Sequence, residues 1–340
     1  MLHTDALGSE PGLWRYAAWL PVERPVVLGE VMTPLVTAPE TNTGGNVSLK
    51  LEYLLPTGSF KDRGMAVLVS WLRQLDIRRV VNDSSGNAGA SLAGYSARAG
   101  IECEVYAPQG NSSAKLAQIE AYGGTLVRVR GSRSAAQEAA RRAAEQDVYA
   151  THMFHPFFLA GTETFAFELW EQTDGETPEA IVFPLGGGSL LLGAANGFRR
   201  LVDAGLTGRV PRLVGVQADL CPPLADAFES GARDPVRGGR GGSIAEGIMI
   251  QEPPRGRQVL EAVRATGGSI TAVDDAAIEA ARVTLGRAGF SVEPTSATAY
   301  AGLRKLRKLG IIRADERVVV ALTGSGLKSA DARRPRSVRP

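Results

Sequence analysis

The feature that most constrains the fold is an alternation of short β-branched runs with longer amphipathic stretches, which starts at Val80. In the first part of this pattern, the sequence predicts strands at 80–81, 102–106 and 125–129 and helices at 88–99, 113–122 and 134–146. Gly100 and the pair Gly123–Gly124 follow two of these helices, where glycine commonly ends a helix. Such alternation is typical of βαβ units, whose strands form a parallel sheet.

The same alternation restarts after about residue 155. Here the sequence predicts strands at 180–183, 213–217 and 317–322 and helices at 159–171, 190–204, 255–266, 275–288 and 296–309. We therefore expect an α/β protein with two parallel layers. A Gly/Arg stretch at 231–242 predicts a mobile surface loop, and the basic residues 331–340 predict a disordered tail rather than a nucleic-acid-binding arm.

Composition excludes several classes of protein. A length of 340 residues is enough for two domains, and 44% hydrophobic with 22% charged residues excludes a wholly disordered chain. A net charge of +2 gives no electrostatic footprint for nucleic acid, and two cysteines exclude a disulfide scaffold or a cysteine-based zinc ribbon. Because no apolar run approaches about 18 residues and the first ten residues lack a signal-peptide design, we expect a soluble cytoplasmic protein without membrane or nucleic-acid partners.

One segment, Pro-Thr-Gly-Ser-Phe-Lys-Asp-Arg-Gly at 56–64, carries the strongest chemical signal. It follows a strand-like run at 47–51 and precedes a predicted helix. Apolar residues on one face define that helix: Met65, Leu68, Trp71, Leu72 and Leu75. Lys61, one of only six lysines, is thereby placed at a loop-to-helix junction, where the helix dipole favours the neutral amine that condenses with an aldehyde cofactor. The residue type alone fits an ordinary surface lysine better.

Two further loops each join a predicted strand to a predicted helix. The loop at 186–189 leaves glycine N–H groups bare at the positive end of a helix, which can hold a phosphate, although a tight packing turn would use the same residues. The loop at 84–89 offers hydroxyl and N–H groups for a carboxylate, and an Asx-type helix cap at Asn87 is its alternative. Thr323 ends a strand beside glycines, as an ordinary β-branched strand terminus also would.

The segment at 56–64 closely resembles the pyridoxal-phosphate lysine motif of threonine synthases, which belong to the fold type II (tryptophan synthase β-like) family. Four more segments resemble motifs of that family in the same order, over roughly residues 28–330: Met32-Thr33-Pro34-Leu35, Ser84-Ser85-Gly86-Asn87-Ala88-Gly89, Gly186-Gly187-Gly188-Ser189 and Leu322-Thr323-Gly324-Ser325-Gly326-Leu327-Lys328. One glycine triplet is weak evidence, whereas five ordered motifs are specific.

The resemblance implies a two-domain α/β fold in which a small domain at 52–155 is inserted into a large cofactor-binding domain made of residues 1–51 and 156–330. It implies that pyridoxal 5'-phosphate lies in the interdomain cleft, at the carboxyl ends of parallel strands. It further implies that Lys61 forms a Schiff base with the cofactor and later acts as general base at the substrate Cα. A homodimer is expected on the same ground.

The remaining cofactor contacts are carried over residue by residue. Phe60 and Asn87 are expected to contact the cofactor, Asn87 with its amide on the ring hydroxyl oxygen. The Thr323 hydroxyl is expected to face the pyridine nitrogen. The cofactor phosphate is expected on Gly186, Gly187, Gly188 and Ser189. Glu293-Pro294-Thr295-Ser296 opens a helix and is placed near the cleft by the resemblance, without an assigned role.

The resemblance also implies where the amino-acid substrate binds. Its carboxylate is expected on the hydroxyl and N–H groups of the loop at 84–89. The substrate-binding residues expected there are Ser84, Ser85, Asn87 and Ala88, the last in place of a threonine. Phe158 is expected to form part of the wall around the distal end of the substrate.

This distal wall departs from the family's Asn-Pro-x-Arg-x-Glu-Gly-x-Lys-Thr pattern, because residues 155–164 read His-Pro-Phe-Phe-Leu-Ala-Gly-Thr-Glu-Thr. Phe158 stands at the arginine, Ala160 at the acid and Glu163 at the lysine. A phenyl ring cannot replace the bidentate clamp that arginine offers a substrate phosphate. An arginine of the 231–242 loop is an alternative source of charge; the candidates are Arg233, Arg237 and Arg240.

These residues and the resemblance predict a pyridoxal-phosphate lyase or synthase that eliminates, with or without replacement, at the β or γ carbon of an amino acid. Conversion of O-phosphohomoserine and water into threonine and phosphate is the best single reaction. A serine/threonine ammonia-lyase, a β/γ-replacement enzyme of specialised metabolism and a non-catalytic cofactor-binding relative remain alternatives. His152 and His155 lie three residues apart without a third ligand, so packing or capping is favoured and no metal is expected.

Overall fold

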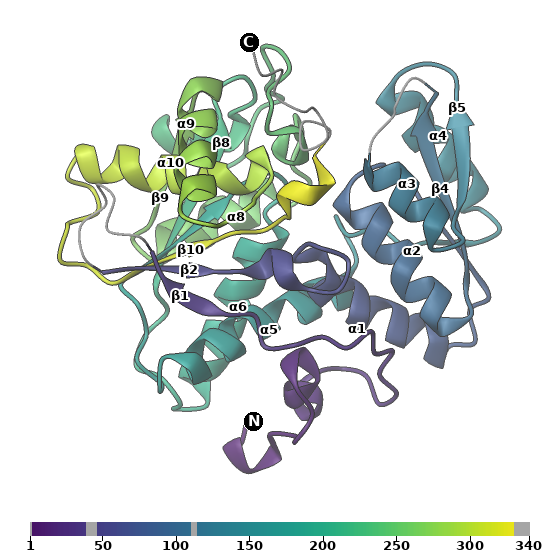
Figure 1. The fold of residues 1–340 in the computed structure, drawn as a ribbon, viewed down its shortest axis with the longest axis horizontal. Coiled ribbons are helices and arrows are strands. Elements are labelled where there is room, and N and C mark those ends of the chain that lie inside the picture. The colour runs from purple at the N-terminus through teal and green to yellow at the C-terminus, as the bar shows by residue number, and fades with distance from the viewer. Residues whose placement is uncertain (1, 39–45, 110–113, 330–340) are drawn as a thin grey trace, which may run out of the picture.

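Two β-sheets organise the chain in the computed structural model, which describes residues 2–38, 46–109 and 114–329 (Figure 1). Within those residues, a six-stranded sheet has the order β1-β2-β10-β7-β8-β9 and a four-stranded sheet the order β5-β4-β3-β6. The large sheet comprises β1 (Leu35–Thr37), β2 (Val47–Lys50), β7 (Ala180–Pro184), β8 (Arg212–Ala218), β9 (Ser269–Val273) and β10 (Val318–Ala321). The small sheet comprises β3 (Arg79–Asn82), β4 (Glu102–Pro108), β5 (Thr125–Val129) and β6 (Val148–Tyr149). Every neighbouring pair is parallel except β1 and β2, which confirms the expected α/β class.

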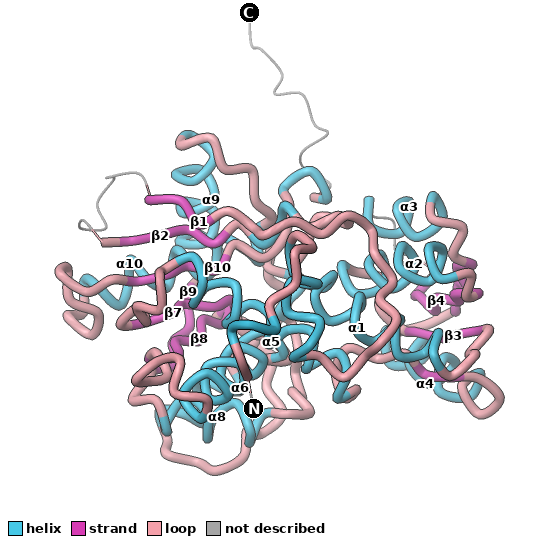
Figure 2. Tube along the Cα trace, turned by 90° about the horizontal axis from the view of Figure 1, so that it is seen from below, coloured by secondary structure: helices cyan, strands magenta, loops and turns pink. Residues whose placement is uncertain are grey.

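Helices cover both faces of the large sheet (Figure 2). They are α5 (Pro156–Gln172), α6 (Ser189–Asp203), α7 (Pro223–Glu229), α8 (Gly256–Ala265), α9 (Asp275–Arg287) and α10 (Pro294–Lys308). Alternate residues of β7 point to opposite faces, so Ile181 and Phe183 pack with α5, α6 and α8, whereas Val182 packs with α9 and α10. A parallel sheet buried on both faces explains why its strands read as nearly continuous apolar runs.

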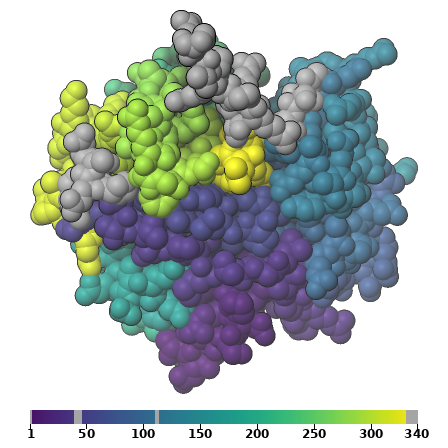
Figure 3. Space-filling model, in the orientation of Figure 1, coloured from purple at the N-terminus to yellow at the C-terminus, as the bar shows by residue number. Residues whose placement is uncertain are grey.

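The small sheet carries its own helices, α2 (Asn87–Ala99), α3 (Ala114–Ala121) and α4 (Arg133–Ala143), which form the blue half of the molecule in Figure 1. In the space-filling view, the yellow end of the described chain lies between this half and the green helices of the large sheet (Figure 3). The two sheets take their strands from separate stretches of chain. The small-domain boundary at 52–155 stays a prediction, and the expected tail at 331–340 lies outside the described residues.

Helix α1 (Lys61–Gln74) crosses α5 at close range, and two glycines permit this approach. A Cβ at Gly161 would lie 2.1 Å from the Arg63 carbonyl oxygen, and one at Gly64 would lie 2.4 Å from the Phe158 ring. Because α1 is enclosed in this way, all of its residues 62–70 are buried, whereas the sequence predicted that only one apolar face would be. The predicted apolar position Leu75 is 53% exposed, because it follows the last residue of the helix.

The sequence predicted most of these elements, with ends that differ by a few residues. It missed β1, β6, β9 and the short helix α7. β1 and β9 lie at the edges of the large sheet and β6 at an edge of the small one. Edge strands are paired on one side and only partly buried, as the pattern of β9 shows, so they lack the apolar run that marked the central strands. Within the described residues, no helix is both long and apolar enough to cross a membrane.

The topology gathers three loops at one edge of the large sheet. β2, β10 and β7 are parallel neighbours, so their carboxyl ends lie side by side. The chain leaves them into the segments 51–60, 322–325 and 185–188, respectively. These segments contain or adjoin three of the five motifs found in the sequence. In open α/β sheets, ligands bind at such carboxyl edges.

Candidate active site

Lys61 is the first residue of α1, and the loop before it is tied to the Thr323 segment. The Phe60 N–H donates to the Thr323 carbonyl oxygen at 3.0 Å, and the Ser325 N–H donates to the Gly58 carbonyl oxygen at 3.0 Å. Ser59 and Gly324 form an antiparallel bridge. Two motifs about 265 residues apart in the chain are therefore held in contact by backbone hydrogen bonds.

The side chain of Lys61 lies against aromatic rings. Its Nζ is 4.5 Å from the ring centroid of Phe60 and 5.6 Å from that of Phe158. Burial lowers the pKa of the Lys61 amine to about 7, and the Glu293 carboxylate partly offsets this effect. A large fraction of the amine is therefore neutral near pH 7, which is the nucleophilic form that the sequence led us to expect.

The residue after Lys61 fixes the start of the helix. The Asp62 carboxylate accepts hydrogen bonds from the Thr57 N–H at 2.6 Å, the Thr57 hydroxyl at 2.5 Å and the Ser91 hydroxyl at 2.6 Å. Burial raises the pKa of Asp62 to about 6, although these hydrogen bonds lower it. Asp62 therefore holds the 57–61 loop against α2, a positioning role that the sequence analysis did not assign.

Asn87 begins α2, and its amide turns toward Glu293 instead of capping its own helix. The Asn87 Nδ2 donates to Glu293 Oε1 at 2.7 Å, and no side-chain cap forms at the start of α2. This geometry rules out the Asx-type cap as the reason for Asn87. Among the described residues its Oδ1 is buried without a hydrogen-bond partner. A buried acceptor without a partner is the kind of group that a ligand satisfies.

The rest of the 84–89 loop is tightly folded. The Ser84 N–H donates to Asn82 Oδ1 at 2.7 Å, and Ser84 Oγ accepts from the Gly86 N–H at 3.4 Å. A Cβ at Gly89 would lie 1.9 Å from the Ser84 carbonyl oxygen, so only glycine fits there. Ala88 is buried. Ser84, Ser85 and Asn87 lie together at the carboxyl end of β3, as expected, while their contact with substrate stays a prediction.

The glycine loop joins β7 to α6, as predicted. Gly188 has φ +80°, and added Cβ atoms at Gly186, Gly187 and Gly188 would meet Ile248 at 2.9 Å, Met153 at 2.7 Å and Val259 at 2.3 Å. Packing alone thus accounts for the glycines, so the triplet does not by itself distinguish a phosphate cradle from a packing turn. The loop does open the 15-residue helix α6, begun by Ser189, whose N-terminus suits an anion.

Thr323 is 3% exposed and lies two residues after the end of β10. Its backbone N–H donates to the Ser296 hydroxyl at 2.7 Å, and its carbonyl accepts from Phe60. Ser296 therefore positions Thr323, which sequence reasoning missed because the two residues belong to different elements. Phe60, Lys61 and Thr323 follow the carboxyl ends of large-sheet strands, and Asn87 follows β3 of the small sheet. The chemistry of these four residues fits an aldehyde-bearing aromatic cofactor.

Phe158, in the first turn of α5, is fully buried and packs on Gly64. Its ring centroid lies 5.8 Å from that of His152. Glu163 is turned toward α6, where its carboxylate is 2.5 Å from Arg200 Nη1. The position at which the family pattern has lysine therefore carries an anion that is already paired.

Within the part of the chain that the structure describes, Arg237 and Arg240 of the 231–242 loop pair with carboxylates away from Lys61. Arg237 lies 3.3 Å from Glu252, and Arg240 lies 3.5 Å from Asp226. Both pairs are well exposed, so their ion pairs are weak and could exchange for other partners. The possibility that Arg233, Arg237 or Arg240 reaches a substrate stays a prediction.

The two histidines serve packing and capping. His155 Nδ1 accepts from the Phe157 N–H at 3.3 Å and caps α5, while its ring lies 4.9 Å from Trp71. Burial, followed by the charge of Lys61, lowers the pKa of His152 well below its ordinary value. Among the described residues, no group of three or more His, Cys, Asp or Glu side chains is placed to hold a metal ion.

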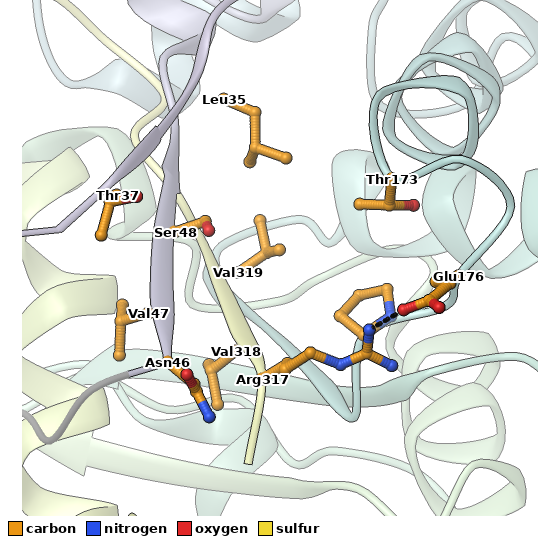
Figure 4. Close-up of a pocket in the computed structure, with 11 residues that line it drawn as sticks. Leu35, Thr37, Asn46, Val47, Ser48, Thr173, Glu176, Arg317, Val318 and Val319 are labelled. Atoms are coloured by element: carbon orange, nitrogen blue, oxygen red, sulfur yellow. Dashed lines mark hydrogen bonds and ion pairs between the residues drawn. The ribbon is translucent and has the colours of Figure 1, made fainter. Parts of the chain in front are cut away.

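A separate cavity of about 220 Å³ lies at the other end of the large sheet (Figure 4). It is lined by the starts of β2 and β10, and Arg317 pairs with Glu176 at its rim. Lys61 lies beyond the carboxyl end of β2, whereas this cavity lies at the amino ends of β2 and β10. The cavity is therefore at the opposite end of the strands from the candidate active site.

Comparison with known proteins identifies the chemistry. A family model described as pyridoxal-phosphate dependent enzyme matches residues 26–324. The threonine synthase of Methanocaldococcus jannaschii is 36% identical over 334 residues, covering 95% of this chain and 82% of that protein. The threonine synthase of Methanosarcina acetivorans is 37% identical over 325 residues, covering 94% and 80%. A solved T.th. threonine deaminase is 27% identical with a TM-score of 0.72, covering 86% and 92%.

Proposed function

Since this chain belongs to the family of pyridoxal-phosphate dependent enzymes and is a lyase of that family, we propose that it catalyses elimination, with or without replacement, at the β or γ carbon of an amino acid. The first candidate reaction converts O-phosphohomoserine and water into threonine and phosphate, as the names of the two archaeal relatives suggest. The observation that carries the proposal is the Lys61 amine, which starts α1 at the carboxyl edge of the sheet with a pKa of about 7.

Each residue of the candidate active site has a separate role in this proposal. Pyridoxal phosphate, when bound, supplies an electron sink for the charge that develops when a proton leaves the substrate Cα. Lys61 would hold the cofactor through its neutral Nζ at the aldehyde position, and the same Nζ would take up the proton from the substrate Cα. Asn87 and Thr323 orient the aromatic ring through its oxygen and nitrogen atoms. The N–H groups of residues 186–189 bind the phosphate, and the Ser84–Asn87 loop binds the substrate carboxylate.

A second candidate is favoured by one specific observation, the buried ring of Phe158 beside Lys61, at the position where the family resemblance implies a phosphate-binding arginine. Each lost hydrogen bond to a charged group costs about 1.5–3 kcal/mol, so two lost contacts would weaken binding of a phosphorylated substrate severely. A substrate with a neutral distal group, as in a serine/threonine ammonia-lyase, suits this wall better. The solved threonine deaminase shares the fold at 27% identity.

Steady-state kinetics on a panel of amino acids separates these candidates. The panel contains O-phosphohomoserine, serine, threonine and their O-acetylated analogues, with Lys61→Ala as the inactive control. Threonine formation from O-phosphohomoserine with little activity on the others would establish the first candidate and direct attention to the arginines of the 231–242 loop. Ammonia release from serine or threonine would establish the second. Cofactor absorbance without turnover of any amino acid would overturn both and identify a non-catalytic binder.

The proposal includes two further expectations, a homodimer and a cytoplasmic location. The homodimer is inferred from the family resemblance, and the cytoplasmic location from the low cysteine count, which fits a reducing compartment. Size-exclusion chromatography with light scattering would test the first expectation, and fractionation of the source cells the second.

A further inference from the structure

A single carboxylate, that of Glu293, links the two halves of the candidate active site. Glu293 is 3% exposed and precedes α10. Its Oε1 accepts from Asn87 Nδ2 at 2.7 Å, and its Oε2 lies 2.8 Å from Lys115 Nζ. Asn87 begins α2 and Lys115 belongs to α3, so both partners come from helices of the small sheet, whereas α10 packs on the large sheet.

The fold is built around this side chain. A Cβ at Gly324 would lie 2.1 Å from Glu293 Oε1, so the residue after Thr323 must be glycine to leave room for the carboxylate. The Glu293 N–H donates to the Gly324 carbonyl oxygen at 3.0 Å. At the helix N-cap, where Ser, Thr, Asp and Asn are preferred, Glu293 makes no side-chain cap. Its carboxylate is therefore directed to Asn87 and Lys115 instead of serving its own helix.

Glu293 decides which way the Asn87 amide faces. An amide carries two N–H donors and one oxygen, and a carboxylate can only accept. The Asn87 nitrogen must therefore face Glu293, which leaves its second N–H and its buried, unpartnered Oδ1 for a ligand. Without the carboxylate, the amide could rotate by half a turn and exchange donor for acceptor.

Glu293 also supplies the negative charge among three amines. Lys61 on α1, Lys115 on α3 and Lys328 after β10 all interact with it electrostatically. Lys328 Nζ is buried and donates to the Thr57 carbonyl oxygen at 2.7 Å, and burial lowers its pKa to about 8 while Asp62 and Glu293 raise it. The other carboxylate that acts on Lys328 is Asp62, which accepts hydrogen bonds from Thr57 and Ser91.

We propose that Glu293 is a positioning residue of the active site, which holds the Asn87 amide in one orientation and places a negative charge beside the Lys61 amine. This inference rests on the proposed function only in that the protein binds pyridoxal phosphate at Lys61. Lys115 is paired with Glu293, so its positive charge is expected to oppose the effect of Glu293 on Lys61.

The test is a pH titration of the absorbance of the cofactor-loaded protein in three variants. Glu293→Gln keeps an oxygen for Asn87 but removes the charge, so the pH at which the spectrum changes should fall by about 0.5–1 unit. Lys115→Met leaves the Glu293 charge unbalanced, so the transition should move to higher pH. Glu179→Gln removes a carboxylate that pairs with arginines at the opposite edge of the sheet and should leave the transition unmoved.

Cofactor affinity tests the orientation of Asn87. Glu293→Met removes the acceptor as well as the charge, so it should weaken cofactor binding about 10-fold more than Glu293→Gln does. Equal affinities in these two variants, or shifts of the same sign in Glu293→Gln and Lys115→Met, would show that Glu293 only supports the fold. If Glu293→Met does not fold, the two opposite spectral shifts still decide. Failure of the wild-type protein to bind pyridoxal phosphate would overturn the proposed function instead.

Discussion

The first turn of α1 carries two basic side chains, Lys61 and Arg63, whose surroundings differ sharply. Arg63 is fully buried between carboxylates: its Nε is 2.6 Å from Glu52 and its Nη1 is 2.9 Å from Glu168. Lys50 Nζ completes this network at 2.5 Å from Glu168. Lys61 lies against two aromatic rings, and within the described residues no hydrogen bond engages its Nζ.

This difference separates a structural charge from a reactive one. Burial opposes ionisation of Glu168, yet the charges of Arg63 and Lys50 hold its pKa below the ordinary value. Glu168 is therefore held in its ionised form, although burial lowers the pKa of Lys50, and the network ties β2, α1 and α5 together. Lys61 has only the more distant charge of Glu293 in its favour, so burial lowers its pKa to about 7. Lys61 and Arg63 lie in the same helix, so the comparison shows that an ion-pair partner decides whether a buried basic side chain stabilises the fold or reacts.

Replacing Lys61 by alanine gives the largest expected effect and tests the reactive side of the comparison. Turnover should fall at least about 1000-fold, and the absorbance of covalently bound cofactor should disappear, because the nucleophile and the Cα base are the same atom. The free energy of unfolding should change by less than about 1 kcal/mol, since no partner is left unpaired. Lys308→Ala, an exposed lysine of α10, is the matched control. A protein–cofactor bond that borohydride still fixes in Lys61→Ala would show that another lysine is used.

Replacing Glu168 by glutamine tests the structural side. The change leaves Arg63 and Lys50 with one carboxylate between them in a fully buried site, so the free energy of unfolding in urea should drop by about 3–5 kcal/mol. Glu138→Gln, which breaks an exposed pair with Arg142, should cost less than about 0.5 kcal/mol. A loss in Glu168→Gln as small as in this control would mean that the network does not hold the helices together.

The pH dependence of cofactor uptake tests the pKa that distinguishes Lys61. The neutral amine is the reactive form and its pKa is about 7, so the rate of covalent uptake should fall about tenfold per pH unit below 7 and level off above it. The amine of N-acetyl-lysine, measured in parallel, should become steadily more reactive up to its ordinary pKa near 10.5. If the protein behaves like the free amine between about pH 8 and 9, burial does not activate Lys61.

The sequence predicted the local parts of this site better than the contacts between them. Lys61, Asn87, Thr323 and the glycine loop were predicted because each lies in a short motif at the end of a strand or the start of a helix, and because those motifs resemble the family's; their roles stay predictions. Asp62 and Ser296 were missed, and Glu293 received no role, because their importance comes from partners in other elements. Glu293 and Asn87 are 206 residues apart in the chain. No periodicity reports a contact of that kind.

Phe158 illustrates the same limit in another way. Its position in the motif predicted the loss of a phosphate clamp, but the sequence could not show that its ring fills the space over Gly64 and reaches Lys61. A residue that differs from the family pattern can therefore have a packing role and a substrate role at once. Only the crossing of α1 and α5 reveals the first.

The smallest effects on affinity and stability are expected from substitutions at Gly187 and Gly188, two adjacent glycines of the 186–189 loop whose surroundings also differ. A side chain at Gly187 would meet the flexible end of Met153. A Cβ at Gly188 would lie 2.3 Å from the branched Val259 side chain, and Gly188 itself has a φ of +80°. Gly187→Leu should therefore weaken cofactor affinity about tenfold with little loss of stability, because the leucine enters the space above the α6 N-terminus. Gly188→Ala should destabilise the fold by about 1–3 kcal/mol, since it combines overpacking with backbone strain. Calorimetry and cofactor titration of both variants measure the two losses separately. If Gly187→Leu loses stability and cofactor affinity in equal proportion, as a packing turn would, then the loop carries no phosphate and the anion site must be sought elsewhere along the carboxyl edge.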